Sequence, residues 1–126
     1  MNADSLYAFY GSLRQGMLNH DQFSHALRYQ FTETLPGYRL HAMEHYPYAI
    51  QTNRSEDVVV AEVYQVVDKR VEQAIHDLEL GVGYSYAEVM IRGRPTGIYL
   101  FKSSGPEPLV QGGDWVKFFG IVNGHP

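Results

Sequence analysis

The sequence predicts an α+β fold, a small mixed β-barrel of about six strands with two main helices. Short stretches rich in β-branched and aromatic residues recur along the chain and are typical of strands. Two further stretches place apolar residues at helical spacing. Glycine and proline turn signals separate these stretches, and their mixed order indicates one tightly curled sheet. The 126 residues fit one compact domain, expected to span 1–126.

The composition excludes several kinds of chemistry. The chain has no cysteine, so disulfides, thiolate metal sites and cysteine nucleophiles are all excluded. Its net charge is −4 and no basic cluster is present, which argues against nucleic acid as the main partner. No apolar run approaches about 18 residues, so we expect neither a membrane span nor a signal peptide. We therefore expect a cytoplasmic protein.

The first predicted strand is the apolar run Leu6–Tyr10, which is followed directly by a glycine. A loop follows over Gly11–Leu18. A helix is then expected to run to about Arg28, with Asn19 or Asp21 as its N-cap. Its apolar face would contain Phe23, Ala26 and Leu27.

Four strands are predicted between the two helices. The strongest of them is Val58–Val67, because it is rich in valine. Its polar and apolar residues do not alternate cleanly, so both of its faces are expected to be partly covered. The turn signal Pro36-Gly37 separates the first two of the other three. Those three are Phe31–Leu35, Tyr38–Ala42 and Tyr46–Ile50.

The second helix is expected to begin after the N-cap Asp68 and to end near Leu80. Gly81 and Gly83 supply the stop signal. Polar residues, Glu72 among them, lie largely off the apolar face. That face is made by Val71, Ala74, Ile75 and Leu78.

The remaining chain predicts a hairpin made of Tyr84–Ile91 and Thr96–Phe101. A loop over Ser103–Pro108 follows it. Trp115–Val122 is compatible with either a last helical turn or a strand. The tail Asn123–Pro126 is expected to be loose.

The stretch Phe9–Arg14 is the first candidate for a site. A strand that breaks at Gly11 and turns toward a helix leaves backbone N–H groups unpaired. Such groups bind an anion or a developing oxyanion.

Glu79 is the second candidate, in the last turn of the second predicted helix. A carboxylate there faces the negative end of the helix dipole and lies at the border of the apolar face. Both effects raise its pKa and favour proton transfer near neutral pH. The alternative is an ordinary boundary glutamate that reaches solvent, and Glu62 and Glu88 compete for the same role.

Five short stretches, taken together, point to a known family. They are Tyr10-Gly11-Ser12-Leu13-Arg14 with Gly16 and Asn19-His20, Glu62-Val63-Tyr64 with Val66, Asp77-Leu78-Glu79, Tyr84 with Tyr86, and Gly113-Asp114-Trp115. In their order and over almost the whole chain, they resemble the γ-glutamylcyclotransferase-like (AIG2-like) family. The sequence departs from that family at Leu80, where many members have glycine after the glutamate, and at Ala87, near a place where many carry arginine. The second departure leaves the substrate specificity open.

The resemblance implies an enzyme that converts a small γ-glutamyl amine or peptide to 5-oxoproline and a free amine. Glu79 would be the general base and then the general acid, and the N–H groups around Gly11, Ser12 and Leu13 would hold the oxyanion or the α-carboxylate. The chemistry requires no cofactor and no metal. The other substrate-binding residues would be Tyr10, through its hydroxyl, Arg14 and Tyr84.

Alternatives remain open at this point. Arg14 is as compatible with a structural salt bridge as with a substrate carboxylate. His41 and His45 have the spacing of a metal pair, but a helix is not expected where they lie, so no metal site is predicted. The chain could also be a binding or regulatory module without turnover, or could hydrolyse another small amide. Neither the leaving amine nor the oligomeric state is predicted.

Overall fold

A five-stranded sheet in the order β2-β5-β1-β7-β6 forms the body of the molecule, and β3 and β4 form a separate two-stranded sheet. The computed structural model describes residues 2–122. The main sheet consists of β1 (Leu6–Phe9), β2 (Leu27–Pro36), β5 (Val58–Val66), β6 (Ser85–Ile91) and β7 (Arg94–Leu100). The small sheet consists of β3 (Tyr38–Ala42) and β4 (Pro47–Gln51).

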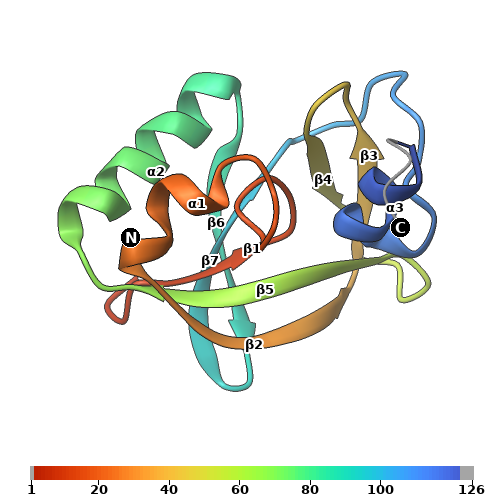
Figure 1. The fold of residues 1–126 in the computed structure, drawn as a ribbon. Coiled ribbons are helices and arrows are strands. Elements are labelled where there is room, and N and C mark those ends of the chain that lie inside the picture. The colour runs from red at the N-terminus through yellow and green to blue at the C-terminus, as the bar shows by residue number, and fades with distance from the viewer. Residues whose placement is uncertain (1, 123–126) are drawn as a thin grey trace.

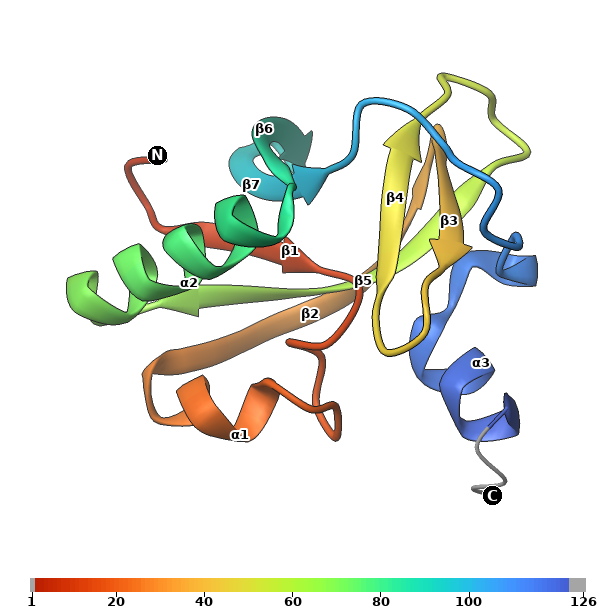
Figure 2. The same cartoon turned by 90° about the horizontal axis from the view of Figure 1, so that it is seen from above.

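The α+β class is therefore confirmed, but the barrel describes the sheet only loosely. Strands β3 and β4 pair with each other instead of joining the main sheet, which leaves β2 and β6 as its two edges. A barrel needs every strand paired on both sides. Figure 2 shows the β3–β4 pair standing across the long strands β2 and β5.

Strand β1 lies inside the sheet, antiparallel to β5 and parallel to β7. Its side chains alternate between the two faces, as the pleat requires. Tyr7 and Phe9 belong to the cluster that contains Ile75 of α2, whereas Ala8 and Tyr10 belong to the cluster that contains Trp115. Figure 1 shows α2 (Lys69–Val82) at one end of β5, with β3, β4 and α3 (Trp115–Val122) toward the other.

The first predicted helix is much shorter than expected. Helix α1 covers only His20–Phe23, a 3-10 turn follows over Ser24–Ala26, and β2 begins at Leu27. Strand β2 pairs with β5 along its whole length, with one irregularity between Tyr29 and Phe31. These inter-strand bonds outweigh the local helical pattern, so the strand predicted at Phe31–Leu35 also starts earlier.

Helix α2 has the predicted N-cap, because the Asp68 side chain accepts a hydrogen bond from the N–H of Arg70 at 2.9 Å. It ends two residues later than expected: Gly81 stays helical, and Gly83 forms the C-cap with a left-handed φ of 114°. Its buried face also differs from the prediction. Leu78 is 38% exposed, whereas Glu72, expected to lie off the face, is only 3% exposed.

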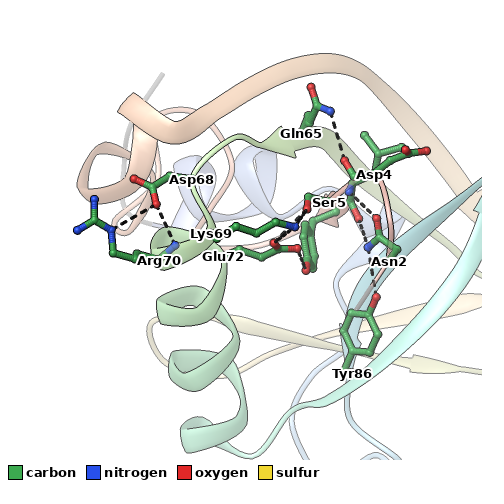
Figure 3. Close-up of polar contacts among 11 residues, drawn as sticks. Asn2, Asp4, Ser5, Gln65, Asp68, Lys69, Arg70, Glu72 and Tyr86 are labelled. Atoms are coloured by element: carbon green, nitrogen blue, oxygen red, sulfur yellow. Dashed lines mark hydrogen bonds and ion pairs between the residues drawn. The ribbon is translucent and has the colours of Figure 1, made fainter.

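The buried Glu72 fastens the start of α2 to the sheet (Figure 3). Its carboxylate accepts hydrogen bonds from the hydroxyls of Ser5, at 3.0 Å, and Tyr7. Lys69 lies 3.4 Å from the same carboxylate. Glu72 and Glu79 are two helical turns apart, so this anchor also determines where Glu79 lies over the sheet.

The C-terminal part follows the prediction closely. Strands β6 and β7 form the expected hairpin. Trp115–Val122 adopts the helical alternative as α3, and Gln111–Gly113 before it forms a 3-10 turn. The predicted tail Asn123–Pro126 lies outside the described residues. No helix within residues 2–122 is both long and apolar enough to cross a membrane.

Candidate active site

A cavity of about 340 Å³ lies where the loop after β1, the end of α2 and the start of β4 meet. Its wall is formed by residues that are far apart in the sequence. Of the predicted site residues, only Arg14 does not line the cavity. The predicted site residues that line the cavity are Tyr10, Gly11, Ser12, Leu13, Glu79 and Tyr84.

The loop after β1 is held in a closed shape by its own hydrogen bonds. The N–H of Asn19 donates to the carbonyl of Ser12 at 2.9 Å, and the Asn19 side-chain amide donates to the Ser12 hydroxyl at 3.0 Å. Asn19 therefore closes this loop instead of capping α1 with its side chain. Within the described residues, the N–H groups of Gly11, Ser12 and Leu13 donate to no acceptor. They are free to bind an anionic or polarised oxygen.

Pro47 supports this loop from the side of β4. A Cβ at Gly11 would lie 2.9 Å from the Cδ and Cγ of Pro47, so no larger residue fits without displacement. The carbonyl of Pro47 accepts a hydrogen bond from the hydroxyl of Tyr84. The loop and Tyr84 are thus positioned against the same residue.

Glu79 is half-buried in the last turn of α2, on the wall of the cavity. Burial raises its pKa from 4.5 to about 7. No hydrogen bond or ion pair to its carboxylate occurs among the described side chains to offset this desolvation. Burial also raises the pKa values of Tyr10, Tyr84 and Tyr99, and the charge of Glu79 adds to each. The carboxylate therefore lies among three phenols, at a pKa suited to proton exchange near neutral pH.

The sequence suggested that the hydroxyl of Tyr10 contacts the substrate, but this hydroxyl is hydrogen-bonded within the protein. It donates to the carbonyl of Tyr99 and accepts from the N–H of Ala49 at 3.1 Å. The hydroxyl thereby connects β1 with β7 and β4, while the residue still lines the cavity.

Arg14 lies outside the cavity, in the salt bridge that the sequence left as an alternative. Its Nε donates to Glu62 at 2.9 Å and its Nη1 to Asp114 at 2.8 Å. Glu62 also accepts from the N–H of Gln15 and the hydroxyl of Tyr64, both at 2.8 Å. Glu62 thus fastens the loop to β5, and it is not among the residues that line the cavity. Glu88 is exposed and accepts from a tyrosine hydroxyl away from the cavity.

Of the His41–His45 pair, His41 already has a partner at each ring nitrogen. His41 is buried, its Nε2 accepts from Arg39 at 3.1 Å, and its Nδ1 lies 2.9 Å from the carbonyl of Glu107. The Arg39 guanidinium can only donate, so the proton of His41 resides on Nδ1. Within the described residues, no group of three or more His, Asp or Glu side chains is arranged to hold a metal ion.

A family model described as Gamma-glutamyl cyclotransferase, AIG2-like, matches residues 7–117. The chain belongs to this family. The protein PH0828 of Pyrococcus horikoshii is 29% identical to this chain over 108 residues, which are 86% of this chain and 88% of that protein. Its name assigns gamma-glutamylcyclotransferase activity only provisionally.

Solved structures agree with this membership of the AIG2-like family. The crystal structure of PH0828 superposes with a TM-score of 0.79 at 26% identity, over 95% of this chain and 97% of the other. An NMR structure of ytfP from Escherichia coli gives 0.70 at 21% identity, over 90% and 98% of the two chains. An AIG2-like protein from mouse gives 0.65 at 20% identity, over 85% and 86%. The last two show the fold alone.

Several cavity residues of this AIG2-like chain were not predicted from its sequence. Tyr99 lines the cavity, and its hydroxyl lies 3.0 Å from Nδ1 of His76 on α2. The sequence predicted its strand but offered no signal for its face. The others are Ala8, Leu18, Asn19 and Leu78.

Proposed function

We propose that this protein converts a γ-glutamyl amide to 5-oxoproline and a free amine, with Glu79 as the proton-transfer group. One observation carries the proposal: Glu79 lines the same cavity as Gly11, Ser12 and Leu13, whose N–H groups donate to no acceptor among the described residues. A base with a pKa near 7 and a set of backbone donors are the two parts that this reaction needs. Membership of the AIG2-like gamma-glutamyl cyclotransferase family supports the same reaction.

The proposed reaction is an intramolecular acyl transfer. The α-amine nitrogen attacks the γ-carbonyl carbon, and the Glu79 carboxylate accepts the proton that the nitrogen loses. The carbonyl oxygen develops negative charge, which backbone N–H groups stabilise. The bond from the carbonyl carbon to the leaving nitrogen then breaks, and Glu79 returns the proton to that nitrogen. Atoms and charge balance without water, cofactor or a covalent enzyme intermediate.

Most of the catalytic effect is expected to come from conformational restriction. The nucleophile and the carbonyl belong to one molecule, so the cavity only has to hold the glutamyl chain folded into a five-membered ring. The aromatic rings of Tyr10, Tyr84 and Tyr99 form a rigid wall suited to this task, because the hydroxyl of each is already hydrogen-bonded to another residue.

Incubation with a panel of γ-glutamyl amines and γ-glutamyl dipeptides tests the proposal. We expect 5-oxoproline, measured by liquid chromatography, from at least one compound, together with one equivalent of the released amine. Release of free glutamate instead would indicate hydrolysis of the amide. Saturable binding of these compounds without any product would indicate a non-catalytic binding module.

The rate is expected to depend on pH with an inflection near 7. Only the unprotonated Glu79 can accept a proton, and burial raises its pKa to about 7, so kcat/KM should rise with pH through that value. One unit below the pKa, the rate should be about tenfold lower than on the plateau. The inflection must persist across substrates whose own amine pKa values differ. An inflection near the ordinary glutamate value would contradict the raised pKa of Glu79, and loss of the inflection altogether would show that Glu79 is not the base.

A further inference from the structure

Three phenols of the cavity wall have hydrogen-bond partners other than the proposed base. The hydroxyl of Tyr10 donates to the carbonyl of Tyr99. The hydroxyl of Tyr84 donates to the carbonyl of Pro47. The hydroxyl of Tyr99 instead lies 3.0 Å from a side-chain atom, Nδ1 of His76. Two of the three partners are therefore backbone atoms, whereas the partner of Tyr99 depends on the identity of one side chain.

His76 lies behind the cavity wall, on the same helix as the proposed base. It is half-buried, does not line the cavity, and precedes Glu79 by three residues, so the two side chains are neighbours on α2. The imidazole meets the ring of Tyr86 edge to face, with centroids 5.9 Å apart. The ring of Tyr99 is stacked on that of Tyr7, with centroids 6.2 Å apart. These contacts fix both rings, so the hydroxyl hydrogen of Tyr99 is the part that can change direction.

The Tyr99 hydroxyl is the donor in its bond with His76. Burial raises the pKa of Tyr99 above its ordinary value of 10.0, so the phenol keeps its proton. Among the described residues, Nδ1 of His76 is its hydrogen-bond partner, and a buried O–H without an acceptor would cost free energy. The neutral imidazole therefore carries its own proton on Nε2. Four ionisable neighbours raise the pKa of Tyr99 further, in order of effect Glu79, Tyr86, Glu72 and Asp77.

The direction of this hydrogen bond matters for the proposed base. A hydroxyl that donated to the Glu79 carboxylate would stabilise its ionised form and make it a weaker base. Of the charges that act on the Tyr99 phenol, that of Glu79 has the largest effect, so Tyr99 is the phenol best placed to become such a donor. The other ionisable side chains of the wall, His45 and Tyr46, come from the turn between β3 and β4.

We propose that His76 is a positioning residue for the reaction: it accepts the hydrogen of the Tyr99 hydroxyl and so keeps this donor away from the Glu79 carboxylate. The inference rests on the proposed function, in which Glu79 is the base. It adds a residue outside the cavity that acts on Glu79 through Tyr99. The lone pairs of the carboxylate are thereby left for the protons of the substrate.

Removal of the acceptor tests the inference. His76→Phe keeps an aromatic ring at this position but has no acceptor, so the Tyr99 hydroxyl becomes free to donate to Glu79. We expect the pKa of Glu79 to fall from about 7 by at least about one unit, the size of a hydrogen bond to a charged group. The pH titration of the Glu79 carboxyl carbon by 13C NMR measures this fall without any turnover. The inflection in kcat/KM should move down by the same amount.

Matched variants separate the hydrogen bond from a general effect of the substitution. His76→Asn places an amide oxygen near the position of Nδ1, so the pKa of Glu79 should stay near 7. Tyr99→Phe removes the donor, so the pKa should also stay near 7, alone and in combination with His76→Phe. His25→Phe is the control for a histidine that is exposed and does not line the cavity, and it should change nothing.

Two results would overturn the inference. One is a pKa of Glu79 that stays near 7 in His76→Phe, or that falls as far in the double variant as in His76→Phe alone. The other is a clear rise of this pKa in Tyr99→Phe, because Tyr99 would then already donate to Glu79 in the parent protein. Either result, with 5-oxoproline still formed, leaves the proposed function standing. The expected titrations without 5-oxoproline from any compound of the panel would overturn the proposed function, while the hydrogen-bond arrangement around Glu79 would stand.

Discussion

Glu79→Gln is expected to lower kcat for 5-oxoproline formation by about a thousandfold, the usual contribution of one positioned acid–base group. Glutamine has the shape of glutamate and keeps a carbonyl acceptor, but it cannot take a proton from the α-amine or return one to the leaving nitrogen. Substrate binding should change little, because the N–H groups of the loop after β1 remain. The measurement is steady-state kinetics with the best substrate of the panel.

Asp77→Asn is the matched control, since Asp77 lies two residues earlier on α2, is exposed, and accepts a hydrogen bond from the side-chain amide of Gln73 at 2.9 Å. It should keep native activity.

The stability of Glu79→Gln gives a second readout. The folded-state pKa of Glu79 is raised, so ionisation lowers the stability of the parent protein as pH rises from about 4.5 to about 7. At pH values above that window, Glu79→Gln should be at least as stable as the parent. A native rate in this variant would remove Glu79 from the mechanism.

Features encoded by neighbouring residues were predictable from the sequence. The valine-rich run of β5, the Asp68 cap and the glycine stop of α2 each depend on local preferences, and the structure has all three. The unpaired N–H groups of the loop after β1 were predictable for the same reason, because a glycine directly after a predicted buried strand interrupts strand pairing.

Features that depend on distant partners were not predictable. Leu27 and Arg28 were expected to end the first helix, and only pairing with β5 makes them part of a strand. The burial of Glu72 requires two distant hydroxyls, that of Tyr7 on β1 and that of Ser5 just before it. The Tyr10 hydroxyl likewise finds its partners on β4 and β7, far along the chain. Spacing on one helix could place Glu79 near an apolar boundary, but not among three phenols.

Arg14→Met is expected to lower the free energy of unfolding by about 3–5 kcal/mol, the usual cost of leaving a buried charge without its partner. The side chains of Arg14 and Glu62 are only 7% and 11% exposed, so water cannot replace the lost guanidinium at Glu62. Methionine fills much of the same volume, which keeps the loss mainly electrostatic. Urea unfolding followed by circular dichroism measures it.

Two further variants show whether the lost salt bridge, and not the change in side-chain size, lowers the stability of Arg14→Met. Arg94→Met breaks an exposed ion pair with Asp4, 3.4 Å long, and should cost less than about 1 kcal/mol. Adding Glu62→Gln to Arg14→Met removes the orphaned charge and should recover part of the loss, because glutamine can still accept from Gln15 and Tyr64. If Arg14→Met instead unfolds like Arg94→Met but raises KM, the guanidinium acts on the substrate carboxylate. In that case the N–H groups of Gly11, Ser12 and Leu13 would be left to the oxyanion alone.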